Sequence, residues 1–409
     1  MSDQGKKIPI PKELTQAGVE TMTEMLPQKL NGGKFTVGIP LELTKGEKRV
    51  ALIPSSIRTL VTQGHQVLVQ SNAGTGAYFT DREFSEAGAK ICTSPKEVYD
   101  CDLLIKVAPP SIKEIELMKP YQLLISPLQL PLINSDYVQK LQSKKVIALA
   151  MEYIQDEVGT FPIVRIMSEM AGLNAILTGA ELLSKAKGGK GMLLGGISGV
   201  PSAKVVILGA GIVSEYATRA ALGLGAEVRI FDDNIYKLKK IQNKIGRPLY
   251  TSAVNQTYLK EELISADLVI GAMHSKTGRT PMIVDENMVM SMKKGSVIID
   301  VSIDQGGCFE TSEVTSFENP TFVKHDVIHY CVPNMASKVS RTASIAFSNI
   351  LTPILLKAAH PAGIEYFITS QPGLRNGIYS YKGFLTNAYL SQRFNLKFMD
   401  LSLLITSQH

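Results

Sequence analysis

The sequence is poor in cysteine, in long apolar runs and in dense blocks of one charge. Its four cysteines show no CxxC spacing, which argues against a disulfide framework and against a zinc site, so we expect no metal. No apolar run reaches ~18 residues, and no secretory segment opens the chain. We therefore expect a soluble, cytoplasmic protein that has no membrane partner.

The positive charge is spread along the chain. The formal net charge is +6, and the densest basic stretch, residues 237–244, is interrupted by Leu238 and Ile241. This pattern is typical of the solvated face of a helix rather than of a nucleic-acid surface. We expect no nucleic-acid partner, although the net charge would favour a small anionic ligand.

Strands and helices alternate through most of the 409 residues. A chain of this length exceeds one ordinary hydrophobic core, so two domains are expected. Helical stretches separate two series of apolar strands, and this alternation predicts parallel sheets. The first series lies at 35–40, 66–70, 103–107 and 146–150, and the second lies at 204–208, 227–231, 267–270 and 296–300.

The predicted fold class is α/β, with two domains that are each a mostly parallel sheet flanked by helices. We expect an N-terminal extension at 1–34, a substrate (catalytic) domain at 35–165 plus 360–409, and a Rossmann NAD-binding domain with its connecting helices at 166–359. A long apolar helix at 166–185, followed by a glycine-rich run, marks the boundary between the two domains.

A glycine turn opens the second series of strands. Gly209 and Gly211 directly follow the strand at 204–208 and begin a helix, and Asp232 ends the next strand. In dinucleotide-binding folds such glycines permit a tight turn and bring the backbone close to the pyrophosphate, which meets the helix N-terminus. Asp232 can accept hydrogen bonds from ribose hydroxyls and would repel a 2′-phosphate, which favours NAD as the cofactor over NADP. Ser214 stands at the third glycine position, where a small residue is enough for close packing. The alternative is an unrelated turn with glycines by chance.

Several further motifs follow one another between residues 36 and 400. They are VGIPLE (37–42), EKRVAL (47–52), NAGTGA (72–77), MSEMAG (167–172), KGGKG (187–191), DVSIDQGG (300–307) and YCVPNM (330–335). Together with the glycine turn, they resemble alanine dehydrogenase and the related nucleotide-binding subunit of proton-translocating transhydrogenase. The IDQGG segment resembles alanine dehydrogenase specifically, because the transhydrogenase subunit lacks that aspartate.

The resemblance implies an enzyme that converts L-alanine, NAD and water to pyruvate, ammonia and NADH. It also implies a subunit of two domains, a small amino-acid or 2-oxo-acid substrate in the cleft between them, and a homo-oligomer, usually a hexamer. Arg49 looks like the arginine that grips the substrate carboxylate, and Asp304 looks like the catalytic aspartate beside the nicotinamide ribose. Cofactor positions fall at Ser168, Gly209, Gly211, Ile212, Val213, Asp232, Lys237, Met273, His274, Val301, Asp304, Asn334 and Met335.

These assignments agree with the chemistry. A planar guanidinium binds a carboxylate with two hydrogen bonds, which fixes the direction of the Cα–H bond, and hydride transfer depends on that alignment. On the residues alone, Arg49 could instead pair with Glu47 at the surface. Asp304 could cap the turn before Gln305, and His274 could be an ordinary loop histidine.

Two positions depart from the family. Its substrate-binding lysine falls at Ala108, and its proton-shuttling histidine falls at Gln129. A histidine titrates near neutral pH, whereas a glutamine does not titrate and can only donate a hydrogen bond to the substrate. We expect Gln129 at the catalytic position, and Lys106, on the same strand face as Ala108, as the substrate-binding lysine.

Three interpretations follow from these departures. The chain could be an alanine dehydrogenase that uses Lys106, or a dehydrogenase for a different amino acid. It could also bind NAD(H) without catalysis, as the transhydrogenase subunit does, since that subunit also lacks the lysine and the histidine at these positions.

Overall fold

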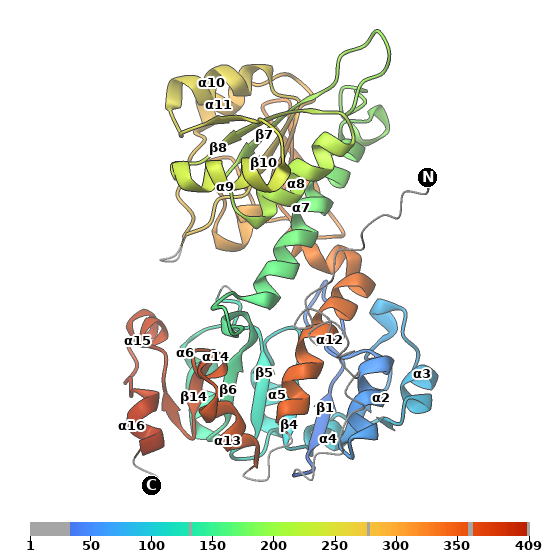
Figure 1. Ribbon diagram of the computed structural model, residues 1–409, viewed down its shortest axis with the longest axis vertical. Helices are drawn as coiled ribbons and strands as arrows, with labels where there is room; N and C mark the ends of the chain where they lie inside the picture. Colours follow the sequence, from blue (N-terminus) through green and yellow to red (C-terminus); the bar gives the residue numbers. More distant parts are fainter. Residues whose placement is uncertain (1–32, 131–132, 276–278, 359–362, 407–409) are drawn as a thin grey trace, which may run out of the picture.

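The computed structural model describes residues 33–130, 133–275, 279–358 and 363–406. The expected N-terminal extension at 1–34 lies outside the described residues except for Gly33 and Lys34. The described part forms two lobes, which are joined by the long helices α7 (Pro162–Leu182) and α12 (Ser340–Lys357) (Figure 1).

The first lobe is built on an eight-stranded sheet. Its order is β15 (Phe384–Leu385), β14 (Ile378–Tyr381), β6 (Ile147–Ala150), β5 (Leu123–Ser126), β4 (Leu103–Ile105), β1 (Thr36–Ile39), β2 (Gln66–Gln70) and β3 (Lys90–Cys92). The strands from β6 to β3 are parallel, whereas β14 runs antiparallel to β6 and to β15. Every residue of β4, β5 and β6 is buried, as expected for parallel strands covered on both faces.

The helices of the first lobe begin with recognisable signals. Proline stands at the first turn of α2, and capping boxes start α3 and α5, at Thr80 with Glu83 and at Ser111 with Glu114. The helices and 3₁₀ turns of this lobe are α2 (Pro54–Thr62), η1 (Thr75–Ala77), α3 (Asp81–Glu86), α4 (Pro95–Tyr99), α5 (Ile112–Leu117), α6 (Ser135–Ser143), η2 (Met151–Tyr153), α13 (Gly363–Ser370), α14 (Pro372–Arg375), α15 (Ala388–Phe394) and α16 (Leu401–Thr406).

The second lobe is built on a seven-stranded sheet in which only β12 is antiparallel within the described residues. Its order is β12 (Thr321–Lys324), β13 (Val327–Tyr330), β11 (Val297–Asp300), β10 (Leu268–Gly271), β7 (Lys204–Leu208), β8 (Glu227–Phe231) and β9 (Tyr250–Ser252). The accompanying helices and turns are η3 (Lys185–Lys187), α8 (Ile212–Gly223), α9 (Ile235–Ile245), α10 (Gln256–Ser265), α11 (Glu286–Met290), η4 (Val301–Gln305) and η5 (Met335–Val339). The expected α/β class with two mostly parallel sheets is thereby confirmed.

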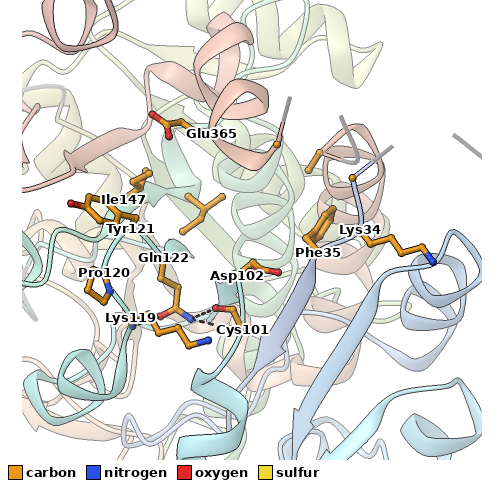
Figure 2. A pocket seen from close by; sticks show the side chains of 14 residues that line it. Lys34, Phe35, Cys101, Asp102, Lys119, Pro120, Tyr121, Gln122, Ile147 and Glu365 are labelled. Atoms are coloured by element: carbon orange, nitrogen blue, oxygen red, sulfur yellow. Dashed lines mark hydrogen bonds between the residues drawn. The ribbon is translucent and has the colours of Figure 1, made fainter. Parts of the chain in front are cut away.

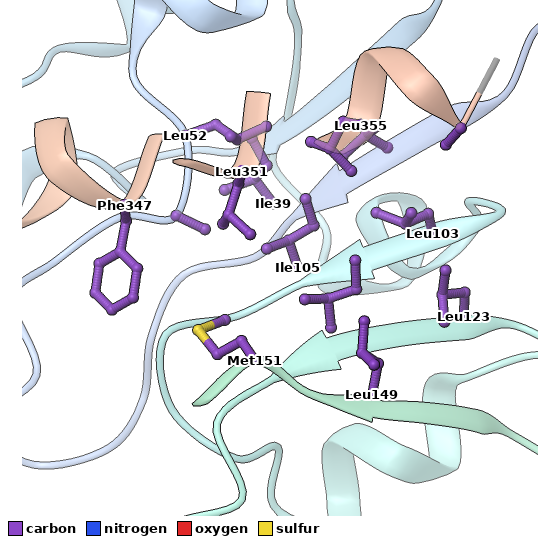
Figure 3. Packing of buried hydrophobic residues seen from close by; sticks show 14 of the residues in the cluster. Ile39, Leu52, Leu103, Ile105, Leu123, Leu149, Met151, Phe347, Leu351 and Leu355 are labelled. Atoms are coloured by element: carbon purple, nitrogen blue, oxygen red, sulfur yellow. The ribbon is translucent and has the colours of Figure 1, made fainter. Parts of the chain in front are cut away.

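The helix α12 returns the chain from the second lobe to the first. Figure 3 shows Leu351 and Leu355 packing against Ile39 of β1 and against the neighbouring strand β4. The segment Met335–Lys357 is long and apolar enough to cross a membrane by length and composition alone. In this structure its apolar face covers the first sheet, which is the usual place of a core helix.

The helix α7 begins earlier and ends earlier than the sequence pattern indicates. It starts at Pro162 rather than at residue 166, because a proline fits the first helical turn, where no backbone N–H is needed. It ends at Leu182, and the separate turn η3 follows at Lys185–Lys187. The turn ends at Gly188, which adopts a left-handed conformation with φ of 87°.

Candidate active site

The carboxyl ends of both sheets carry the residues singled out from the sequence. In the first sheet, Arg49, Lys106 and Gln129 follow β1, β4 and β5. In the second sheet, Gly209, Asp232, His274, Asp304 and Asn334 follow β7, β8, β10, β11 and β13. Open α/β sheets bind ligands outside this edge, so the topology alone places the expected site at the two carboxyl edges.

The glycine turn after β7 has the geometry that a dinucleotide needs. Gly209 has φ of 105°, and a Cβ atom there would lie 2.4 Å from the carbonyl oxygen of Ala272. At Gly211 a Cβ would meet nothing within 4 Å among the described residues, so this side of the turn is open. No described side chain caps the N-terminus of α8, which leaves its first N–H groups available to a pyrophosphate.

Close packing beside this turn comes from α7. Ser214, at the expected third glycine position, is fully buried in α8. The close approach between the helices is made by Gly172 of α7, where a Cβ would lie 2.4 Å from the carbonyl oxygen of Val213. Gly172 therefore allows a close contact between α7 and α8, and the small, buried Ser214 stands at the position that serves helix–strand packing.

Asp232 ties the glycine turn to the end of β8. Its carboxylate accepts hydrogen bonds from the backbone N–H groups of Ala210 and Asn234, both at 2.8 Å. The ammonium of Lys237 lies 3.7 Å away at the start of α9. His274 belongs to the same corner, since burial and then the charge of Lys237 lower its pKa. A carboxylate has about four acceptor positions, so Asp232 keeps capacity for ribose hydroxyls. These residues fit an NAD site.

Arg49 is buried, with 3% of its surface exposed, and it forms a two-point ion pair with Glu47. Its Nε donates to Oε1 of Glu47 at 2.7 Å, and its Nη2 donates to Oε2 at 2.6 Å. The ion pair proposed from the sequence therefore exists, but it lies in the interior rather than at the surface. Nη1 contacts the sulfur of Met167 at 3.3 Å. The outer Nη1–Nη2 edge retains donors for a substrate carboxylate.

Asn334 connects the two lobes. Its backbone N–H donates to Oδ1 of Asp304 at 3.0 Å, and its side chain donates to Oε2 of Glu47 at 3.1 Å. Ser337 adds hydrogen bonds to the carbonyl of Gly46 and to Glu47. A continuous chain of hydrogen bonds therefore runs from Asp304 through Asn334 and Glu47 to Arg49, and it links the two residues with expected chemical roles across the lobes.

The loop that carries Asp304 is held by another aspartate. Asp300 ends β11, and its carboxylate accepts from the N–H groups of Ser302 and Cys308, each at 3.0 Å, and from the hydroxyl of Ser312 at 2.7 Å. These bonds close the turn on both sides of Asp304. The site aspartate is therefore presented by a fixed 3₁₀ turn rather than by a free loop.

Electrostatics distinguish Glu47 from Asp304, the two carboxylates whose pKa the charge of Arg49 lowers. Glu47 is buried, yet its bonds to Arg49 overcome the burial and lower its pKa. Asp304 is open to solvent, but protein surrounds it closely enough that desolvation raises its pKa, against the N–H of Asn334 and the charge of Arg49. Glu47 is thus a fixed anion, whereas Asp304 can exchange a proton at a higher pH than an ordinary aspartate.

Lys106 lies inside the first lobe. Its ammonium is 2.9 Å from both Glu42 and Glu114, and only 1% of the side chain is exposed. Burial would lower the pKa of Lys106, but the two glutamates outweigh this effect and raise it. The substrate-binding role expected for Lys106 stays a prediction, and its two carboxylate partners favour a structural role.

The two family departures stand at the same edge. Ala108 is buried, and Gln129 is half-buried in a left-handed conformation with φ of 42°. Such a conformation is uncommon outside glycine, asparagine and aspartate, so the surrounding turn must hold it in place.

The other expected cofactor residues lie on α7, α8, η4 and η5 and on the segment after β10. Ile212 and Val213 open α8, and Val301 opens η4. The carbonyl of Met273 accepts a hydrogen bond from Ser302, and Met335 is buried at the start of η5. Ser168 lies on α7, next to the residue that contacts Arg49. Their contacts with a cofactor stay predictions.

Family models match nearly the whole chain. The description of the first is "Alanine dehydrogenase/PNT, N-terminal domain", which matches residues 38–171, and that of the second is "Alanine dehydrogenase/PNT, C-terminal domain", which matches residues 175–388. The chain belongs to the alanine dehydrogenase/PNT family. The resemblance drawn from the motifs is confirmed.

Members of the alanine dehydrogenase/PNT family with similar sequences and structures bear the name alanine dehydrogenase. Alanine dehydrogenase 2 of Staphylococcus aureus (strain USA300) is 40% identical over 366 residues, which cover 89% of this chain and 98% of that protein. A solved L-alanine dehydrogenase is 35% identical with a TM-score of 0.83, over 88% of this chain and 99% of the other. A transhydrogenase from Sinorhizobium meliloti shares the fold at 24% identity with a TM-score of 0.74, over 86% and 99%.

A cavity elsewhere in this family member is not part of the site. It has a volume of about 370 Å³ and lies at the opposite, amino edge of the first sheet (Figure 2). Its walls include Phe35, Asp102, Leu123 and Ile147, each at or just before the first residue of a strand. The conserved topology of open α/β folds puts ligand chemistry at the other edge.

Two residues of the site are not identified by sequence reasoning. Glu47 is considered there only as a possible partner of Arg49, although it also binds Asn334 from the other lobe. Glu152 follows β6 and contacts the turn of Gln129, and it belongs to none of the quoted motifs. A glutamate directly after a buried strand at the carboxyl edge is the signal that could have marked it.

Proposed function

We propose that the chain is an NAD-dependent dehydrogenase that deaminates L-alanine to pyruvate and ammonia. The observation that carries this proposal is the chain of contacts from Asp304 to Arg49. It links Arg49 of one lobe, which would bind the substrate carboxylate, to Asp304 of the other lobe, which would exchange a proton. The balanced reaction is L-alanine + NAD⁺ + H₂O → pyruvate + NH₄⁺ + NADH + H⁺.

The residues of the chain divide the work of this reaction. Arg49 would bind the substrate carboxylate through its Nη1–Nη2 edge. The two hydrogen bonds to Glu47 fix the orientation of the guanidinium plane. Bound NAD⁺ would supply the acceptor for the hydride that leaves Cα. Asp304, whose pKa is raised, would accept the proton that the substrate ammonium group loses before the hydride leaves. Asp232 and the glycine turn would hold the dinucleotide.

One alternative rests on a specific observation. Ala108 and Gln129 cannot perform the roles of the family lysine and histidine. A chain that binds NAD(H) without catalysis would not need those two roles, so both departures agree with this alternative. The proposal of a dehydrogenase for another small amino acid uses the same arginine and the same aspartate. Both alternatives keep NAD as the cofactor and keep the site at the carboxyl edges.

The test is NADH formation from NAD⁺ with a panel of L-amino acids and 2-hydroxy acids, with NADH binding measured in parallel. Activity with L-alanine supports the proposal, and activity confined to another amino acid changes the substrate. Tight NADH binding without any turnover favours the alternative in which the chain binds NAD(H) without catalysis. In that case the paired change Ala108→Lys with Gln129→His should create activity, because Arg49 and Asp304 are already in place. The two changes belong together, since groups that act as one unit are not additive.

A further inference from the structure

We propose that Glu152 takes over the proton transfer for which the chain has no histidine, acting from directly beside the turn that carries Gln129. This inference rests on the dehydrogenase function proposed above. It assigns a catalytic residue that no quoted motif contains.

The position of Glu152 supports the proposal. It lies in η2, directly after β6, at the same carboxyl edge as Arg49 and Gln129. Its Oε1 accepts a hydrogen bond from the backbone N–H of Leu128 at 2.7 Å. The adjacent N–H of Gln129 also acts on this carboxylate. The carboxylate therefore contacts the backbone of the residue where the family's histidine would stand.

The second oxygen of Glu152 is unused. Oε2 is buried and has no hydrogen-bond partner among the residues that the structure describes. A buried carboxylate oxygen without a partner costs free energy, so its persistence needs a reason. A proton, or a water molecule that donates one, would satisfy it.

The surroundings favour proton uptake at this carboxylate. Burial raises the pKa of Glu152, and the N–H groups of Glu152 itself, Leu128 and Gln129 only partly oppose this effect. The titratable groups that feel its charge are Tyr137 of α6, Tyr379 of β14 and Tyr153 of its own turn, and burial raises the pKa of all three. They are uncharged near neutral pH, and no described cation stabilises the carboxylate among the causes of its shift.

Asp304, on the second lobe, is assigned the proton of the substrate ammonium group above, and two other side chains of the first lobe are less suitable for the transfer assigned to Glu152. Lys106 has a raised pKa and two carboxylate partners, so it remains a charged ammonium and cannot accept a proton. Gln129 does not titrate. Glu152 is a described titratable side chain that touches the 128–129 turn and has a free acceptor.

The proposed step balances. After the hydride leaves Cα, a water oxygen forms a bond to the carbon of the C=N group, whose π electrons move to nitrogen. The proton of that water passes to Oε2 of Glu152. Glu152 then returns the proton to the amine nitrogen, the C–N bond breaks, and ammonia leaves with the electron pair. Ammonia takes the hydroxyl proton as ammonium, so Glu152 ends as it began.

The decisive variant is Glu152→Gln. Glutamine keeps a carbonyl oxygen for the N–H of Leu128 but cannot accept a proton. We expect kcat for the active amino acid to fall about 10²-fold or more, with KM and the Kd of NADH unchanged. Glu152→Asp, which keeps a proton acceptor, should retain more activity than Glu152→Gln. The control is Glu116→Gln, which removes an exposed ion pair with Lys140 and should change nothing.

Four outcomes would overturn the proposal. Wild-type kcat in Glu152→Gln would show that the carboxylate only holds the turn, and the dehydrogenase function would stand. Equal activity of the aspartate and glutamine variants would have the same meaning. This comparison is made only with variants that bind NADH as the wild type does. If Glu152→Gln does not fold, the acidic limb of the pH profile of Glu152→Asp is measured instead, and an unchanged midpoint would contradict the proposal. A wild-type chain that oxidises none of the panel would contradict both the inference and the dehydrogenase function.

Discussion

Arg49 shows how one side chain can satisfy two requirements. Its buried charge needs a partner, and Glu47 supplies two hydrogen bonds to one edge of the guanidinium. The planar group then offers its other edge to a ligand, in an orientation that the ion pair fixes. A lysine would keep the charge, but its ammonium cannot bind Glu47 with one planar edge and a ligand with another.

Substitution of Arg49 by lysine should therefore affect the substrate and spare the cofactor. We expect Arg49→Lys to lower kcat/KM for the amino acid by about 10²-fold, because a misplaced carboxylate turns the Cα–H bond away from its target. The Kd of NADH should not change. Arg82→Lys, in an exposed ion pair with Glu86, is the matched control. Unaltered kinetics in Arg49→Lys would leave only the structural ion pair.

The acidic limb of the pH profile reflects raised carboxyl pKa values. Desolvation raises the pKa of Asp304 and of Glu152, so each holds its proton to a higher pH than it would in water. The form that accepts protons is the ionised one, so kcat should fall as the pH drops, with a midpoint above the ordinary carboxyl pKa of about 4. A profile that is flat down to that value would contradict both assignments.

Cofactor choice depends on Asp232. We expect its buried carboxylate to face the ribose of the bound dinucleotide, where it would repel a 2′-phosphate. We expect NADPH to bind about tenfold or more weakly than NADH, a difference of ~1.4 kcal/mol. Fluorescence titration with both nucleotides measures this ratio. Equal affinities would show that Lys237, 3.7 Å from Asp232, cancels the repulsion.

At the residue scale, the sequence predicts identities better than contacts. The motif positions of Arg49, Asp304 and Asn334 come together in the structure. The bridge through Glu47 joins residues that are 287 positions apart in the sequence. The bond between Glu152 and Leu128 joins residues 24 positions apart. Local patterns contain no such information.

Among the elements, the contact between α7 and α8 supports the cofactor site. Gly172 allows the backbone of α8 to approach α7, and this contact sets the position of the helix N-terminus that would meet the pyrophosphate.

The variant Gly172→Ala tests this contact with a clear sign. An alanine normally stabilises a helix interior relative to glycine by roughly 0.5–1 kcal/mol. Here its Cβ would press on the carbonyl of Val213, so we expect Tm to fall by at least about 2 °C and NADH binding to weaken. Gly223→Ala, in α8 where the space is open among the described residues, is the control and should not lower Tm. A stabilised Gly172→Ala would contradict the role of this contact.

Element prediction succeeds where hydrophobic runs are long and bounded. The strands at 66–70, 204–208 and 227–231 have the predicted bounds. The strand β5 and the pair β14 and β15 are not recognised from the sequence. The strand β14 pairs with β6 across more than 200 residues, and periodicity identifies a strand but never its partner.

At the scale of the whole molecule, the two lobes carry their expected site residues after the carboxyl ends of their strands. α7 and α12 join the lobes, and Asn334 and Ser337 make hydrogen bonds between them. Arg49 belongs to one lobe and Asp304 to the other, so the proposed reaction requires a fixed orientation of the two lobes. This arrangement explains why the two-lobed fold, rather than the dinucleotide turn alone, defines the proposed enzyme.

The most direct test of this arrangement is L-alanine-dependent NADH formation by the wild-type chain and by Asp304→Asn, with the Kd of NADH measured for both. We predict turnover by the wild type, and a fall of about 10²-fold or more in Asp304→Asn with NADH still bound, because asparagine fills the same space without exchanging a proton. Equal turnover by both proteins would contradict the role of Asp304. NADH binding with no turnover by the wild type on any amino acid would contradict the proposed dehydrogenase itself.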